Sequence, residues 1–164
     1  MNKTDADNFW YFSLEIYGLP GVADRLIALQ DDYGADVNFV LFCCWCGQEG
    51  RQPLDAAFFE RADRDLGVWR QEVIDVLRNL RREMKGGVRG ISPETSEPLR
   101  GEVKRLELDA ERVMQSALAS LAPSVVGPGG PAYAREALEA YFRHRGIAVT
   151  GDVSKLIDLL AEGV

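Results

Sequence analysis

The stretch that decides the fold is VNFVLFCCWC, residues 37–46, in which nine of the ten side chains are apolar and Asn38 is the exception. Asp36 precedes this stretch and is the type of residue that caps a helix N-terminus. A helix that is apolar on nearly every face is buried on every face, so we expect this helix at the centre of the protein. Spanning a bilayer takes about 18 apolar residues, so the stretch predicts a core helix and no membrane anchor.

The cysteines of the chain all lie in this stretch, as Cys43, Cys44 and Cys46. Such close neighbours on a helix point in different directions and their number is odd, so no disulfide framework is expected. A redox-active or metal-binding pair is the alternative, but no further Cys or His lies nearby in sequence to complete a metal site. Packing in the core is therefore favoured. Reduced thiols, together with a polar N-terminus that has no secretory signal, predict a cytoplasmic protein.

Helix signals recur on both sides of the central stretch, whereas strand signals are nearly absent. Capping and breaking residues mark the predicted ends: Asp7 and Gly18 for the first helix, Pro20 and Gly34 for the second, and Asp55 for the start of a short helix after the central one. The first half of the chain therefore predicts a cluster of helices around residues 37–45.

Two long helices are predicted next, over residues 66–84 and 99–121, with a glycine- and proline-rich linker over residues 85–98 between them. The second of these helices has the most regular apolar spacing in the chain, at Leu99, Val103, Leu106, Ala110, Val113, Ala117 and Leu121. Two long helices joined by one short linker predict an antiparallel hairpin.

The remaining residues begin with PSVVGPGGP at 123–131 and contain two short predicted helices, near residues 134–144 and 153–161. We therefore predict an all-α fold: a compact bundle with a central buried helix, a long antiparallel hairpin and a short helical C-terminal tail. Residues 1–122 form the predicted bundle domain. Residues 123–164 form a flexible linker and a tail too small for its own core, which either packs on the bundle or stays loosely attached.

The charge balance limits the chemistry of this 164-residue chain, which has 26 acidic residues, 19 basic residues and one histidine, for a net charge of −7. An acidic protein is a poor candidate for a nucleic-acid binder, and a single histidine excludes a histidine-rich zinc centre. The charge is uneven, at −6 over residues 1–50 and +2 over residues 51–90. No complete catalytic set is present, so a non-enzymatic protein without a cofactor is favoured.

Asp31, Asp32, Asp36 and Asn38 form an acidic corner between the second and third predicted helices. Their oxygen atoms are the ligands that Mg²⁺ and Ca²⁺ prefer, so Asp31, Asp36 and Asn38 are candidate binding residues. The first three are also candidate metal ligands. The competing interpretation, favoured by the helix break expected at Gly34, is that Asp36 caps a helix and the other two carboxylates decorate a helix end.

A basic ridge is predicted at Arg78, Arg81, Arg82 and Lys85, which share one helix face at spacings of three, four and seven residues. Such a ridge can receive a phosphate, an acidic segment of a partner, or RNA. The competing interpretation is salt bridging across the hairpin, in which Arg78 pairs with Glu107. For Arg81 and Arg82 the two interpretations stay open.

Four consecutive aromatic residues, Phe9 to Phe12, cannot all face one core, because a helix turns by about 100° per residue. At least one of them must be exposed or covered by another part of the chain. Trp10 is therefore a candidate binding residue, since exposed tryptophan and tyrosine side chains are frequent hot spots in interfaces. Packing against the C-terminal helices is the alternative.

Several strings in the first half of the chain carry a resemblance to a known family: Phe9-Trp10-x-Phe12-Ser13-Leu14, Tyr17, Pro20-Gly21-Val22, Leu29-Gln30-Asp31, Gly34, Asp36-Val37-Asn38 and Leu41-Phe42-x-x-Trp45. The pattern resembles a family of small, mainly proteobacterial proteins of about 160 residues and unknown function. The similarity continues to Glu111, fades after Pro123 and covers about the first two-thirds of the chain. It implies a cytoplasmic bacterial protein and brings no activity, substrate or cofactor.

The sequence thus favours a cytoplasmic interaction or adaptor module with a protein partner, no nucleic acid and no membrane, and it leaves a homo-oligomer open. The alternative is a small-molecule site, in which Asp31, Asp36 and Asn38 bind a divalent metal while the ridge from Arg78 to Lys85 receives a phosphate.

Overall fold

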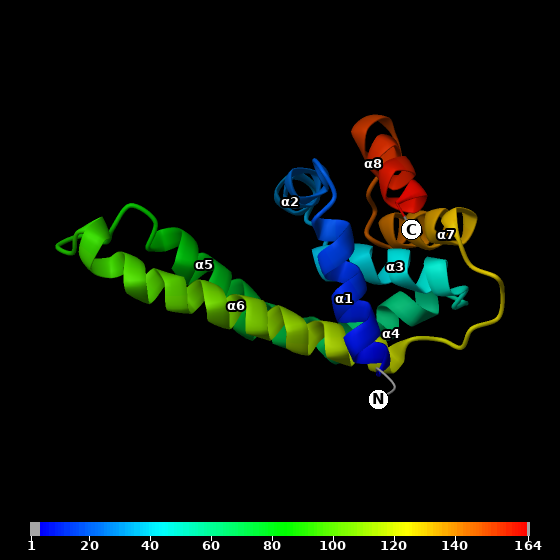
Figure 1. Ribbon diagram of the computed structural model, residues 1–164, viewed down its shortest axis with the longest axis horizontal. Helices are drawn as coiled ribbons and strands as arrows, with labels where there is room; N and C mark the ends of the chain where they lie inside the picture. Colours follow the sequence, from blue (N-terminus) through cyan, green and yellow to red (C-terminus); the bar gives the residue numbers. More distant parts are fainter. Residues whose placement is uncertain (1–3, 164) are drawn as a thin grey trace. The chain divides into compact units, whose positions relative to one another are not determined.

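The computed structural model describes residues 4–163 (Figure 1). The helices are α1 (Asp5–Tyr17), α2 (Val22–Tyr33), α3 (Val37–Glu49), α4 (Ala56–Trp69), α5 (Asp75–Glu83), α6 (Pro93–Leu121), α7 (Pro131–His144) and α8 (Gly151–Glu162), with a π-helical turn, Arg70–Ile74, between α4 and α5. Residues 4–163 contain isolated β-bridges but no strand, so the predicted all-α fold is confirmed.

The chain divides into two compact units. We call Met1–Ala62 with Gln115–Val164 the first unit, and Asp63–Met114 the hairpin unit. The boundaries between the two units fall within α4 and within α6. The domain boundary predicted from the sequence lies instead at residue 122. Residues 123–164, which the sequence sets apart as a linker and tail, belong to the first unit together with α1, α2 and α3.

Helix α3 is the centre of the first unit, as its composition predicts. Every residue from Asn38 to Gly47 is buried, and α1, α2 and α7 all contact this helix. Aromatic rings fill the space around it: Phe42 stacks on Phe58 with ring centroids 5.6 Å apart, and Phe39 stacks on Tyr141 at the same distance. Each such pair stabilises the fold beyond the area that it buries.

The starts of α1 and α2 differ from their predicted positions. Thr4 is the N-cap of α1: its hydroxyl oxygen accepts a hydrogen bond from the Asp7 backbone N–H at 3.2 Å, and the Asp7 carboxylate accepts from the Thr4 backbone N–H at 3.4 Å. Asp7 is therefore the second member of a capping box and not the cap. Pro20 lies in the turn before α2, because Gly21 at φ +76° is the N-cap and the helix begins after it.

The short helix predicted after Asp55 and the long helix predicted over residues 66–84 are joined in the structure. Asp55 does cap α4, since its carboxylate accepts from the Phe58 N–H at 2.9 Å, but the helical backbone then continues through the π-turn into α5. Polar residues 63–65 interrupt the apolar pattern without breaking the backbone. The extra residue of a π-turn also rotates the apolar face of the helix. The apolar residues before and after the turn therefore do not fall on one regular spacing, and the sequence pattern resembles that of two separate helices.

Helix α6 begins earlier than predicted, at Pro93, and it contains Pro98. Proline is favoured in the first turn of a helix, where its missing N–H has no intrahelical partner. Pro98 lies one turn further, where it removes one hydrogen bond and the helix nevertheless continues. The predicted linker over residues 85–98 therefore shortens to the residues between α5 and Pro93.

Helix α7 packs against α3 in the first unit, with Leu138, Tyr141 and Phe142 almost fully buried. The proline- and glycine-rich segment before it is tied to the end of α3 by backbone hydrogen bonds. The Val126 N–H donates to the Gly50 carbonyl at 2.9 Å, and the Gly130 N–H donates to the Gly47 carbonyl at 3.0 Å. These bonds fix the path of the chain from α6 to α7.

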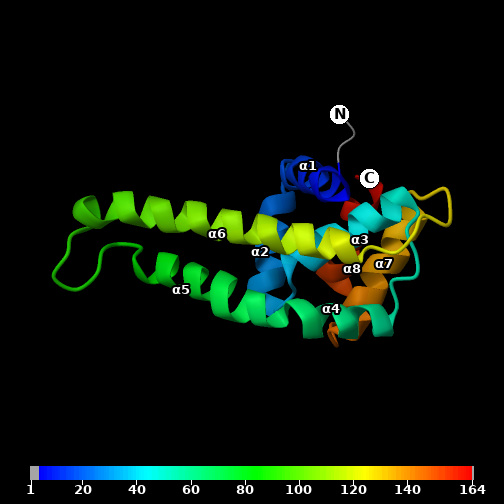
Figure 2. The same cartoon turned by 90° about the horizontal axis from the view of Figure 1, so that it is seen from below.

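In the hairpin unit, α5 and α6 run antiparallel, as predicted (Figure 2). The apolar spacing of α6 divides into two rows. Val103 and Ala110 are buried, and the Ala110 carbonyl accepts a hydrogen bond from the Trp69 indole N–H at 3.1 Å. The second row, Leu99, Leu106 and Val113, is 62%, 49% and 52% exposed. This second row is therefore only partly covered by the residues that the structure describes.

Candidate functional site

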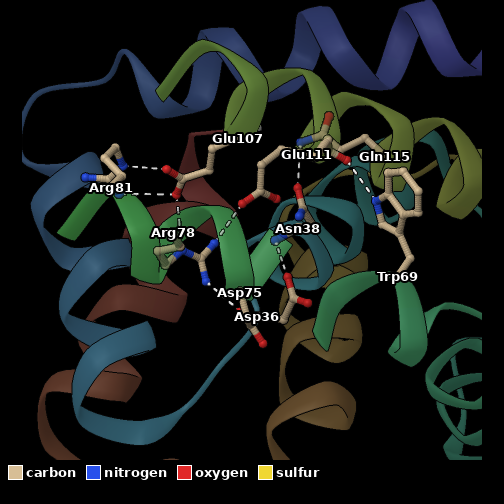
Figure 3. A network of polar contacts seen from close by, with 10 residues as sticks. Asp36, Asn38, Trp69, Asp75, Arg78, Arg81, Glu107, Glu111 and Gln115 are labelled. Atoms are coloured by element: carbon tan, nitrogen blue, oxygen red, sulfur yellow. Dashed lines mark hydrogen bonds and ion pairs between the residues drawn. The ribbon is translucent and has the colours of Figure 1, made fainter. Parts of the chain in front are cut away.

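The basic ridge of α5 takes part in an ion-pair network with α6 (Figure 3). Arg78 donates to Glu107 at 3.3 Å, to Glu111 at 2.7 Å and to Asp75 at 3.2 Å. Arg81 donates to both carboxylate oxygens of Glu107, one of them at 3.2 Å. Glu107 is thus held by two guanidinium groups, and its side chain is only 11% exposed.

This network contains the predicted pair of Arg78 with Glu107, and it gives Arg81 the same partner. Arg82 and Lys85 lie at the exposed surface. Burial raises the pKa of Glu107, but the hydrogen bonds and charges of Arg81 and Arg78 outweigh this effect, so the pKa is lowered overall. The arrangement acts as a clamp between α5 and α6. Phosphate binding by the ridge stays a prediction.

Replacing Glu107 by glutamine is expected to destabilise the hairpin unit by about 2 kcal/mol, because two half-buried guanidinium groups lose their shared carboxylate. The wild-type contribution exists above the unfolded pKa of about 4.3 and is lost as pH falls through the lowered folded pKa. Urea unfolding between about pH 3 and pH 7 should therefore show that the free energy of unfolding falls less steeply with decreasing pH in Glu107→Gln than in the wild type.

The matched control is Glu97→Gln, since Glu97 pairs with Arg100 on the same helix at 2.9 Å and its side chain is 60% exposed. An exposed pair of this kind contributes less than about 1 kcal/mol. Equal changes in the two variants would contradict the assignment of Glu107 as the clamp between the helices.

In the first unit, Asp36 and Asn38 of the acidic corner lie at the start of α3 (Figure 3). The Asp36 carboxylate accepts from the Asn38 backbone N–H at 2.9 Å, and the Asp36 N–H donates to the Tyr141 hydroxyl at 2.8 Å. The Asn38 side-chain oxygen accepts from the Gln115 amide at 3.1 Å. The N-cap interpretation of Asp36 is confirmed, and the buried Asn38 amide is hydrogen-bonded to Gln115.

Asp31 and Asp32 are exposed near the C-terminal end of α2. Asp32 lines a depression of about 390 Å³, to which Arg25, Asp152 and Lys155 also contribute. Among residues 4–163, no group of three or more His, Cys, Asp or Glu side chains is arranged to hold a metal ion. The corner and the basic ridge belong to different units, and metal binding by Asp31, Asp32 and Asp36 stays a prediction.

The cysteines are packed inside the first unit. Cys43, Cys44 and Cys46 are free thiols and are fully buried. Burial raises the pKa of Cys44 to about 12, and burial likewise raises the pKa of Cys43 and of Cys46 far above the ordinary value. The reactive thiolate is therefore suppressed at neutral pH, which agrees with the core-packing interpretation.

The aromatic residues of α1 point in different directions. Phe9 is fully buried and stacks on Trp45 with ring centroids 5.2 Å apart, and Phe12 is buried as well. Trp10 is half-buried. Tyr11 is 49% exposed, which confirms that the four rings do not share one core, and the exposed row continues to Leu14 at 49% and Tyr17 at 39%.

A cavity of about 550 Å³ in the first unit was not predicted from the sequence. It lies between residues 52–56 and the face of α7 that carries Glu136, Glu139, Arg143 and His144. The His144 ring stacks on Phe59 with centroids 5.5 Å apart. About 80 residues separate the two walls along the chain, and no local pattern indicates that they lie side by side, so the sequence offers no signal for the cavity.

No helix within residues 4–163 has the length and apolar character needed to cross a membrane. No curated protein and no solved structure matches the chain. A family described as "Protein of unknown function (DUF2390)" matches residues 8–118, which span α1 to most of α6 and cover more than half of the 164 residues. The similarity seen in the N-terminal strings is thus confirmed, and the chain belongs to this uncharacterised family.

Proposed function

We propose that the protein is a non-enzymatic interaction module and that the outer face of α1 binds another protein. The observation that carries this proposal is the exposed row of Tyr11, Leu14 and Tyr17 on a helix whose opposite side is buried. Tyrosine is enriched among the residues that dominate binding energy, because it offers a large amphipathic surface at low entropic cost.

Helix α1 is firmly anchored on the side opposite this row. Phe9 and Phe12 anchor α1 in the core, and the capping box at Thr4 fixes its first turn. A side chain that protrudes from an anchored helix loses little freedom on binding, so more of its contact energy appears as affinity. Trp10, the candidate from the sequence, is half-buried and lies at the edge of the row.

Charge indicates the kind of partner. The hairpin unit contains eleven acidic and eleven basic residues, so the net charge of −7 resides in the first unit. Within α1 itself the charged residues are Asp5, Asp7 and Glu15, all acidic. A partner with a basic surface is therefore attracted to this unit. The buried, reduced thiols support a cytoplasmic setting as part of the same proposal.

The test is affinity purification of the tagged full chain from its native cells after crosslinking. We expect Tyr11→Ala/Tyr17→Ala to lower the yield of a specific basic protein at least about tenfold, as for the loss of hot-spot residues. The matched control is Tyr33→Ala, since Tyr33 is 52% exposed in the same unit but lies on α2. Identical recovery with the double variant and the wild type, or no specific protein with the wild type, would refute the proposal.

A further inference from the structure

One row of exposed apolar side chains runs along α6 in the hairpin unit. Leu99, Leu106 and Val113 recur every seven residues, and Val103 and Ala110 interleave with them on the side that is buried in the hairpin. Together the two rows form the heptad pattern of a helix that contacts neighbours on both sides of its apolar seam. One side of this seam is filled by α5, and the other side is exposed.

A matching row lies on α5, where Val76 and Leu80 are 55% and 43% exposed. A helix turns by about 100° per residue, and Met84 points into the hairpin. Viewed along α5, Val76 and Leu80 therefore lie on one side of Met84 and Arg78 lies on the other side. On α6, Leu106 likewise lies across the buried row from Glu111. Because Arg78 and Glu111 contact each other, they mark one face of the hairpin, and the two apolar rows share the other face.

The charges beside the row favour a second copy of the chain as the occupant. Glu102, Arg105, Asp109 and Arg112 alternate in sign along α6, and Glu102 also pairs with Arg105 on the same helix at 2.6 Å. If α6 meets the same helix of another copy in antiparallel orientation, centred at position 107, next to Leu106, Arg112 lies opposite Glu102 and Arg105 lies opposite Asp109. Each of these four charged side chains then faces a side chain of opposite charge in the other copy. A partner helix that is uniformly basic or uniformly acidic would place an opposite charge beside only two of the four.

The net charge of the hairpin unit points the same way. This unit carries eleven acidic and eleven basic residues, so two hairpins meet without net repulsion, although the chain as a whole carries −7. We propose that two copies of the chain associate through the Leu99–Leu106–Val113 face of the hairpin unit, forming an antiparallel four-helix bundle with two-fold symmetry. This inference is independent of the α1 surface.

Sedimentation equilibrium of the full chain tests the proposal over a range of concentration. We expect the wild type to have twice the monomer mass of 18.2 kDa. Leu106→Glu should sediment as a monomer, with a dissociation constant raised at least about 100-fold, because a charge would be buried at the centre of the interface. The matched control is Leu108→Glu, since Leu108 is 53% exposed on the same helix but faces away from the row, and this variant should remain dimeric.

A charge exchange tests the antiparallel arrangement itself. Arg112→Glu alone should weaken the dimer, because it places two acidic residues opposite each other, and Glu102→Arg/Arg112→Glu should restore it. Helical circular dichroism confirms that each variant is folded. A monomeric wild type at about 100 µM, or a dimer that Leu106→Glu leaves intact, would overturn the proposal. A dimer that the exchange fails to rescue would overturn the antiparallel pairing.

Discussion

Replacing Gly47 by alanine is expected to lower the free energy of unfolding by about 3 kcal/mol or more. A Cβ atom at Gly47 would lie 2.2 Å from the Cα and 2.4 Å from the backbone N of Ala134. Both are main-chain atoms of α7, so no side-chain rotation can relieve the overlap and the two helices must separate. That separation would disturb the buried contacts of Leu138 and Tyr141 and the bond from Gly130 to the Gly47 carbonyl.

Urea unfolding followed by far-ultraviolet circular dichroism measures this effect. The matched control is Gly101→Ala in α6, where a Cβ meets nothing within 4 Å. Alanine is the better helix former, so the control should gain up to about 1 kcal/mol. A Gly47→Ala variant as stable as the wild type would show that α3 and α7 are not in this close contact.

Gly47 also shows which parts of the fold a sequence can predict. The burial of α3 follows from its composition alone, because a helix that is apolar on all faces has no side to present to water. The antiparallel hairpin follows from two regular helices and one linker. The contact of Gly47 with Ala134 joins residues 87 positions apart, and neither position differs locally from an ordinary helical glycine or alanine. Such contacts depend on the three-dimensional packing of elements that the sequence predicts only one at a time.

The candidate site follows the same division. The pair of Arg78 with Glu107 could be predicted, because the register of an antiparallel hairpin is set by the lengths of its helices and linker. The second role of Glu107, as the partner of Arg81, depends on how α5 is rotated, and the π-turn before α5 changes that rotation. The bond between Asp36 and Tyr141, 105 positions apart, lacked any local signal.

Replacing Trp45 by alanine is expected to destabilise the first unit by about 4 kcal/mol, the loss typical of a large aromatic side chain removed from a core. Trp45 is 1% exposed, and its ring centroid lies 5.2 Å from the ring centroid of Phe9 and 5.9 Å from that of Phe42. The Arg51 guanidinium lies 4.8 Å from the ring centroid, so a cation–π contact is lost as well. For a chain of this length the melting temperature should fall by about 10 °C or more.

Thermal unfolding followed by circular dichroism separates this loss from a general effect of removing an aromatic residue. Tyr11→Ala is the control, because Tyr11 lies on the neighbouring α1 with half of its surface exposed, and its removal should cost less than about 0.5 kcal/mol. The cavity left by Trp45 is walled by Phe9 and Phe42 on two different helices, so collapse of one wall would move α1 against α3. The large expected loss therefore reflects a site that cannot close without displacing a helix. Equal melting temperatures for the two variants would exclude Trp45 as a main contact between α1 and α3.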